Sequence, residues 1–191
     1  MIYRLYLTTF LIALSTSVFS QTLKDALDKK DTVAALKLIK AGGDINAVDN
    51  NGTSPLMNAC RWGDEPMVYF LLVNGATPDK PRSAKGRTAL IVACAYYSGK
   101  TICGLLIDKG ADVNAVTNAG ETALMYAAQN AKVDVVMLLL KKGADPKLKD
   151  NAGKTALDYA RSGEITDYVI KSNKDTRIDK LEVIKILEGA K

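Results

Sequence analysis

Two series of glycines recur at nearly the same interval along the chain, and this periodicity limits the possible folds more than any other feature. The first series has spacings of 34, 34 and 33 residues and comprises Gly52, Gly86, Gly120 and Gly153. The second has spacings of 33, 35 and 33 residues and comprises Gly42, Gly75, Gly110 and Gly143. Two glycine series in phase indicate that the chain is built from copies of one small unit.

The residues after each glycine of the first series predict the start of a short helix. They read "TSPL", "RTAL", "ETAL" and "KTAL", so a Ser or Thr precedes a Pro or Ala and then a Leu. The hydroxyls of Ser54, Thr88, Thr122 and Thr155 can cap the free N–H groups of a first helical turn. Bulky apolar runs such as "VVMLLLKKG" predict a second helix in each unit, which ends on the second glycine series.

This pattern resembles the ankyrin repeat, a unit of about 33 residues with two helices, a β-turn finger and a T-P-L-H-x-A signature. The signature here reads "SPLMNA", "TALIVA", "TALMYA" and "TALDYA", and "GADVNA" stands at residues 110–115. The resemblance covers residues 22–161 and implies an all-α solenoid of about five stacked helix-pair units with β-turn fingers. Other residues replace the signature His, namely Met57, Ile91, Met125 and Asp158. We expect Met and Ile to fill that site with apolar contacts, without the family's hydrogen-bond network.

The repeat frame divides the chain into six segments. They are a signal peptide (1–20), a capping unit (21–51), three full repeats (52–85, 86–119 and 120–152) and an altered C-terminal repeat (153–191). In the last segment we expect an insertion at residues 162–178, with a helical stretch around residues 165–170. A capping amphipathic helix would follow at residues 179–188, with Leu181, Ile184 and Leu187 as its apolar positions.

The N-terminal segment has the plan of a secretory signal peptide. The apolar run "LYLTTFLIAL" follows Arg4, and Val18 and Ser20 occupy the small-residue positions of a cleavage site before Gln21. The run is short against the ~20 residues that a membrane-spanning helix needs. We therefore expect export, to a periplasm or the extracellular space, after cleavage between Ser20 and Gln21. An uncleaved membrane anchor is the alternative.

The composition argues against catalysis. The chain contains no His, which removes Ser–His and Cys–His pairs as well as the commonest metal ligand. Asp44, Asp112 and Asp145 share one position in the finger, so turn and backbone bonding explain them better than acid–base chemistry does. We expect no enzyme activity, no cofactor and no metal. The net charge of +5 is too mild to indicate nucleic-acid binding.

The three cysteines, Cys60, Cys94 and Cys103, are expected to be buried thiols that pack as small apolar residues. Cys60 and Cys94 occupy the same position in neighbouring units. Stacked helices lie ~8–10 Å apart, whereas the Cα atoms of a disulfide lie within ~7 Å, so these two should not pair. Cys103 falls in the second helix of the unit that contains Cys94, and a disulfide between those two stays open.

What is known of ankyrin domains implies partner binding through the fingers and first helices, at positions that the signature leaves free. Basic and aromatic residues gather at and near those positions in the second and third units: Arg61, Trp62, Arg82, Lys85, Arg87, Tyr96 and Tyr97. Trp, Tyr and Arg often dominate the energetics of interfaces. We therefore expect a monomer that binds a protein partner with an acidic surface. The alternative is that Trp62 packs over the neighbouring helix, stacked on Arg61.

These features lead to one functional hypothesis and two alternatives. We expect an exported, bacterial-type, non-catalytic interaction module, with inhibition or protection of a neighbouring enzyme or toxin as one subtype. The first alternative is a scaffold attached to the cell envelope. The second is an enzyme accessory whose activity lies in the C-terminal segment, residues 162–191.

Overall fold

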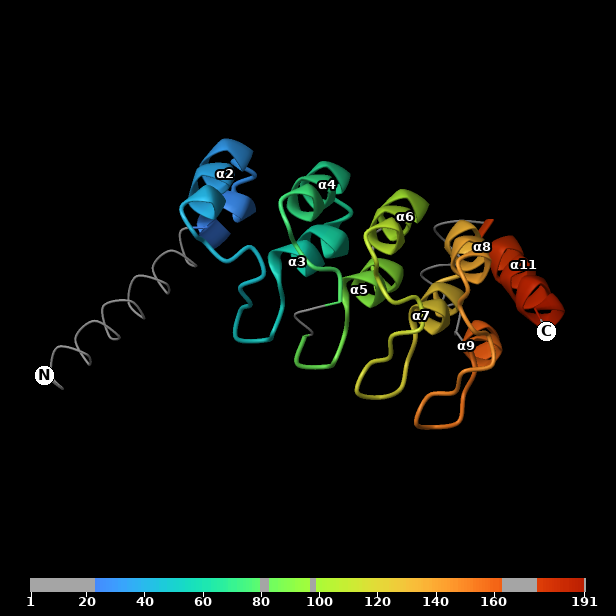
Figure 1. Ribbon diagram of the computed structural model, residues 1–191. Helices are drawn as coiled ribbons and strands as arrows, with labels where there is room; N and C mark the ends of the chain where they lie inside the picture. The colour runs from blue at the N-terminus through green and yellow to red at the C-terminus, as the bar shows by residue number, and fades with distance from the viewer. Residues whose placement is uncertain (1–22, 80–82, 97–98, 163–174, 191) are drawn as a thin grey trace, which may run out of the picture.

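The computed structural model describes residues 23–79, 83–96, 99–162 and 175–190 (Figure 1). Residues 23–28 are helical, and the helices that follow are α2 (Thr32–Lys40), α3 (Pro55–Trp62), α4 (Glu65–Val73), α5 (Ala89–Ala95), α6 (Lys100–Asp108), α7 (Ala123–Gln129), α8 (Val133–Lys141), α9 (Ala156–Ser162) and α11 (Asp175–Gly189). No sheet forms in this described part, where an isolated bridge joins Val116 and Thr122. The predicted all-α stack is confirmed. The predicted signal peptide and the stretch at residues 165–170 lie outside the described residues.

The helices form two parallel rows. The first helices of successive units, α3, α5, α7 and α9, pack against one another in order, and so do the second helices α4, α6 and α8. Helix α11 packs on α8 and α9 and closes the C-terminal end of the stack (Figure 1). The finger loops all project from the same edge of the stack in Figure 1.

The predicted helix caps are present at the start of the first helices. The hydroxyls of Ser54, Thr88 and Thr122 accept hydrogen bonds of 3.2, 3.4 and 3.2 Å from the backbone N–H three residues later. In the last unit, Thr155 donates from its backbone N–H and its hydroxyl to the Asp158 carboxylate, at 2.8 and 2.7 Å. The backbone N–H of Asp158 also donates to the Thr155 hydroxyl at 3.4 Å, so the fourth predicted cap is present as well. The bonds made by backbone N–H groups satisfy donors that the helix itself leaves free.

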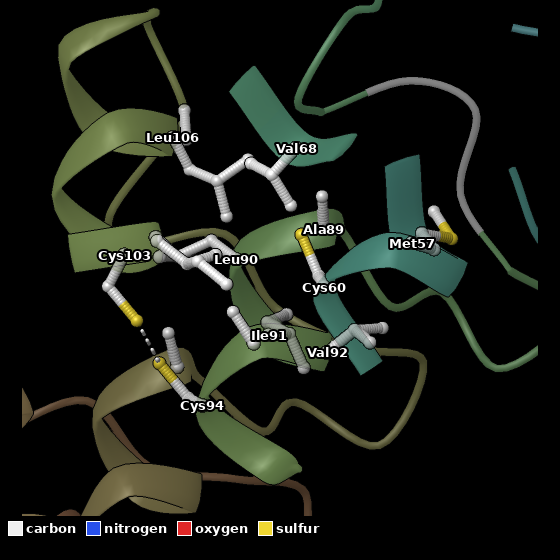
Figure 2. Close-up of a cluster of buried hydrophobic side chains, with 14 of the residues drawn as sticks. Met57, Cys60, Val68, Ala89, Leu90, Ile91, Val92, Cys94, Cys103 and Leu106 are labelled. Carbon is white, nitrogen blue, oxygen red and sulfur yellow. Dashed lines mark hydrogen bonds between the residues drawn. The ribbon is translucent and has the colours of Figure 1, made fainter. Parts of the chain in front are cut away.

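A continuous apolar core lies between the two rows. The residues that replace the signature His, Met57, Ile91 and Met125, are fully buried in it, as expected. The side chains of Cys60, Cys94 and Cys103 are also buried in this core (Figure 2). Apolar burial of this kind is the main force that holds stacked units together.

The fingers are tied to one another in series by backbone hydrogen bonds. The backbone N–H of Ala84 donates to the carbonyl oxygen of Asn51 (2.8 Å). In the same way, Asn118 donates to the carbonyl oxygen of Lys85 (3.1 Å) and Asn151 to that of Ala119 (2.9 Å). In three of the fingers, an aspartate carboxylate accepts a hydrogen bond from the backbone N–H two residues later. These aspartates are Asp44, Asp112 and Asp145. The turn role predicted for these aspartates is confirmed.

Helix α11 differs from the prediction in its start and in its buried face. It begins at Asp175, within the expected insertion, rather than at residue 179. Val183 and Leu187 are buried, whereas Leu181 is 61% exposed. Residues four apart stay on one helical face better than residues three apart, because the turn contains 3.6 residues. The expected apolar face was therefore wrong at Leu181.

Candidate functional site

The predicted surface lies where α3 ends and where the finger that precedes α5 returns. Trp62, the last residue of α3, is 71% exposed, and Lys85 in the finger is also exposed. Arg61, Arg87 and Tyr96 are half-buried. Arg82 and Tyr97 lie outside the described residues.

The structure brings Arg61, Tyr96 and Arg87 together, and we call these three residues the arginine–tyrosine cluster. The guanidinium carbon of Arg61 lies 5.1 Å from the centroid of the Tyr96 ring. Nη1 of Arg87 donates a hydrogen bond to the hydroxyl of the same tyrosine at 3.4 Å. Arg61 thus stacks on the tyrosine of the next unit, and the indole of Trp62 remains exposed to solvent.

A chain of polar contacts continues from Arg87 into the fourth and fifth units. Nη2 of Arg87 donates to the Tyr126 hydroxyl at 2.9 Å, and that hydroxyl donates to Glu121 Oε2 at 2.6 Å. The hydroxyl of Tyr159 lies 3.3 Å from Glu121 Oε1 and 2.8 Å from Asp150 Oδ2. The face of the first helices is therefore crossed by one connected network rather than by isolated side chains.

Sequence reasoning identified Tyr96 but missed Tyr126 and Tyr159, although the repeat frame contains a signal for both. Arg87 and Glu121 both directly follow a glycine of the first series, and Tyr126 and Tyr159 both come six residues after one. In the stack, these two positions meet across neighbouring units. Aligning the units by position would have paired them.

The two arginines carry charges that no carboxylate neutralises within the described residues. The ion pairs found there are Lys24–Asp28, Lys30–Asp64, Asp108–Lys142 and Arg161–Glu188. Burial disfavours the charged form of Arg87, but the hydrogen bonds to Tyr126 and Tyr96 outweigh it and raise the pKa of the guanidinium. The Nε atoms of Arg61 and Arg87 are buried and lack a hydrogen-bond partner. The cluster is thus a fixed positive site with unused donor capacity.

A groove borders this cluster on its N-terminal side. It has a volume of about 1080 Å³ and separates the first unit from α3 and α4, with Leu27, Val48, Pro55, Arg61 and Trp62 among its lining residues. An ion pair of 2.6 Å between Lys30 and Asp64 joins the two units beside the groove. Arg61, a member of the cluster, and its neighbour Trp62 therefore also line the groove.

The described part of the chain contains neither a candidate metal site nor a candidate membrane-spanning helix. No group of three or more cysteine or carboxylate side chains is placed to hold a metal ion. Within the same residues, no helix combines the length and the hydrophobicity needed to span a membrane.

Comparison with known proteins agrees with the observed stack. A family model described as "Ankyrin repeats (3 copies)" matches residues 23–117 and 95–180. The neurogenic locus notch homolog protein 2 of Homo sapiens is 37% identical over 105 residues, which are 55% of this chain but 4% of that protein. The neurogenic locus notch homolog protein 1 of Xenopus tropicalis is 37% identical over 101 residues, again 4% of its length. Ankyrin repeats are protein–protein interaction modules, and this chain belongs to the ankyrin repeat family.

Proposed function

We propose that the chain is an exported, non-catalytic binding protein that grips a protein partner with an acidic surface. The contact surface would consist of the arginine–tyrosine cluster, Trp62 and Lys85, together with Arg82 and Tyr97. The observation that carries this proposal is the pair of guanidiniums, Arg61 and Arg87, held around Tyr96 without a carboxylate partner among the described residues. Export would place the mature chain, starting at Gln21, in a periplasm or outside the cell.

The cluster is suited to carboxylates because its arginines are already fixed. Arg87 is held by two tyrosine hydroxyls, and Arg61 is stacked on an aromatic ring. Less side-chain entropy is lost when a preorganised group binds. Hydrogen bonds between a guanidinium and a carboxylate are short and strong, and their bidentate geometry fixes the partner's orientation.

Trp62 supplies the apolar part of the same surface. A tryptophan buries about 150–250 Å² when it is covered, and 71% of this residue's surface is still accessible. Contact of the indole with a partner would therefore add hydrophobic energy beside the charged contacts. Such a combination of Trp, Tyr and Arg is typical of residues that dominate binding energy.

The binding proposal can be tested without a label because Trp62 is the only tryptophan in the chain. Candidate partners are first captured from the source cells with the chain from Gln21 onward. Each is then titrated into that chain while the tryptophan emission is recorded. We expect a blue shift that weakens at high salt and is lost in Arg87→Glu, which keeps the tryptophan. Capture of the partner should be lost in Trp62→Ala plus Arg87→Glu.

A matched control uses the same kinds of substitution on the second helices. Tyr69 and Lys141 are both exposed, on α4 and α8, so Tyr69→Ala plus Lys141→Glu should retain the partner. Equal recovery of the partner by both double variants would exclude the proposed surface. Export is tested separately by mass spectrometry of the N-terminal peptide of the exported protein, which should begin at Gln21.

A further inference from the structure

Two of the buried thiols, Cys94 and Cys103, face each other between the two helices of the third unit. Cys94 lies on α5 and Cys103 on α6, and their sulfur atoms are 3.9 Å apart (Figure 2). Bond formation requires the sulfurs to approach to ~2.05 Å. The two sulfurs therefore need to come about 1.9 Å closer for the bond to form.

The surroundings favour reaction at Cys103. The hydrogen bond between the Cys94 and Cys103 sulfurs lowers the pKa of Cys103, and the nearby Lys132 ammonium acts in the same direction against the effect of burial. The Lys132 side chain is fixed there because its Nζ donates to the carbonyl oxygens of Ala93 and Tyr96 at the end of α5. By contrast, burial raises the pKa of Cys60. Since the thiolate is the nucleophile, Cys103 is the thiol that reacts first.

We propose that Cys94 and Cys103 form an intramolecular disulfide when the chain meets a disulfide oxidant. The Cys103 thiolate attacks one sulfur of the oxidant and expels the other as a thiolate, which leaves a mixed disulfide. Cys94 loses its proton, attacks the Cys103 sulfur and expels the second oxidant thiolate. The two cysteines lose two electrons and two protons, and the oxidant leaves as two thiols.

The oxidant reaches the pair through the start of α6 or while the chain is folding. Gly99, the N-cap residue of α6, provides no side-chain hydrogen bond to the first turn of that helix, and a helix end without a cap frays more easily than a capped one. The disulfide would close a ring from residue 94 to residue 103. Tyr96 lies inside this ring, so the bond would also restrict the loop that carries this one member of the arginine–tyrosine cluster.

This inference does not depend on the identity of the partner, and it can be tested on the full chain. The reduced protein is incubated with oxidised glutathione, remaining thiols are alkylated in denaturant, and the product is digested with trypsin. Cleavage after Lys100 separates the two cysteines into residues 88–100 and 101–109. We expect these two peptides to be recovered joined by a disulfide, while the peptide that contains Cys60 is alkylated.

Variants supply an independent measurement. Alanine stands at residue 128, the position in the fourth unit that corresponds to Cys60 and Cys94, so alanine is the substitution of choice. Oxidation should raise the midpoint of thermal unfolding of the native chain and of Cys60→Ala, but not of Cys94→Ala or Cys103→Ala. Recovery of residues 88–100 and 101–109 only as separate alkylated or glutathionylated peptides would overturn the proposal, and so would a bond to Cys60.

Discussion

The guanidinium carbon of Arg87 lies 5.0 Å from the ring centroid of Tyr126, and Nη2 donates to that tyrosine's hydroxyl at 2.9 Å, although the two residues belong to neighbouring units. Glu121 repeats this relationship one unit later, where it accepts from the hydroxyl of Tyr159 at 3.3 Å. The residue after each of these finger glycines thus contacts a tyrosine of the following unit. Arg87 therefore has two roles, in holding units together and in the proposed contact with a partner.

Removal of the Arg87 guanidinium should lower stability as well as binding. Arg87→Met loses two hydrogen bonds and one cation–π contact, and we expect the free energy of unfolding to fall by about 1–2 kcal/mol. Lys85→Met removes the same charge from an exposed side chain of the same finger and should change stability little. Urea denaturation measures both, and equal losses would mean that charge rather than contact explains the effect.

The close approach of neighbouring fingers predicts a difference between two equivalent glycines. Gly120 and Gly153 share a φ of +79°, but a Cβ on Gly120 would lie 2.8 Å from Oδ1 of Asn151, whereas one on Gly153 would meet nothing within 4 Å. Gly153→Ala should lower the free energy of unfolding by about 1 kcal/mol, because alanine is strained at this positive φ. Gly120→Ala should cost about 1–3 kcal/mol more, because the next finger must move. Thermal unfolding of the two variants compares them directly, and equal midpoints would contradict the contact.

Asp64 allows the ion pair between the first two units to be separated from a helix cap. It pairs with Lys30 at 2.6 Å and accepts from the N–H of Met67 at 3.2 Å as the N-cap of α4. Asp64→Asn keeps the cap and removes the ion pair, so it should lower the free energy of unfolding by less than about 1 kcal/mol. Asp64→Ala removes both and should cost about 1 kcal/mol more. Lys30→Gln should reproduce Asp64→Asn and not Asp64→Ala.

The effect of pH on this pair follows from the direction of the pKa shift. The hydrogen bond from Lys30 holds the pKa of Asp64 below its ordinary value. A lowered folded-state pKa stabilises the protein above the unfolded pKa of about 4. The difference in the free energy of unfolding between the native chain and Asp64→Asn should therefore be largest at neutral pH. It should vanish as the pH falls through the folded-state pKa of Asp64. A difference that persists in strong acid would exclude the ion pair as its source.

Local signals explain what could be predicted from the sequence. The caps at Ser54, Thr88 and Thr122 depend on residues within one turn, and each was identified from its own short stretch. The stack as a whole follows from the phase of the glycines, since a single unit cannot bury its apolar face alone. Burial of Met57 could be expected because an apolar side chain can replace the His without an unsatisfied polar group.

Contacts between units were harder to predict because they depend on the rotation from one unit to the next. One alternative from the sequence was that Trp62 packs over the neighbouring helix, stacked on Arg61. In the structure, the Arg61 guanidinium lies over the ring of Tyr96, which belongs to the following unit. The same rotation pairs Glu121 with Tyr159, residues far apart in the chain. By contrast, the buried face of α11 is contained in a local pattern, because Val183 and Leu187 are four residues apart, and a spacing of three was followed instead.

The buried Tyr126 and the half-buried Tyr159 should make the protein sensitive to alkali. Burial, together with a hydrogen bond to Glu121, raises the pKa of Tyr126, and burial with a hydrogen bond to Asp150 raises that of Tyr159. A group whose pKa is higher in the folded state than in the unfolded state stabilises the protein most below the unfolded-state pKa, which is about 10 for tyrosine. This stabilisation is lost as the pH rises toward the folded-state pKa. The free energy of unfolding should therefore decline above about pH 10.

Phenylalanine substitutions isolate this contribution. The double variant Tyr126→Phe, Tyr159→Phe should be less stable at neutral pH because it lacks the hydroxyl bonds to Glu121 and Asp150. It should also decline less steeply above about pH 10, since neither ring can ionise. Tyr69→Phe, on an exposed face of α4, should retain the native slope. Urea denaturation across this pH range compares the three proteins, and parallel declines would mean that the network tyrosines do not govern the loss of stability.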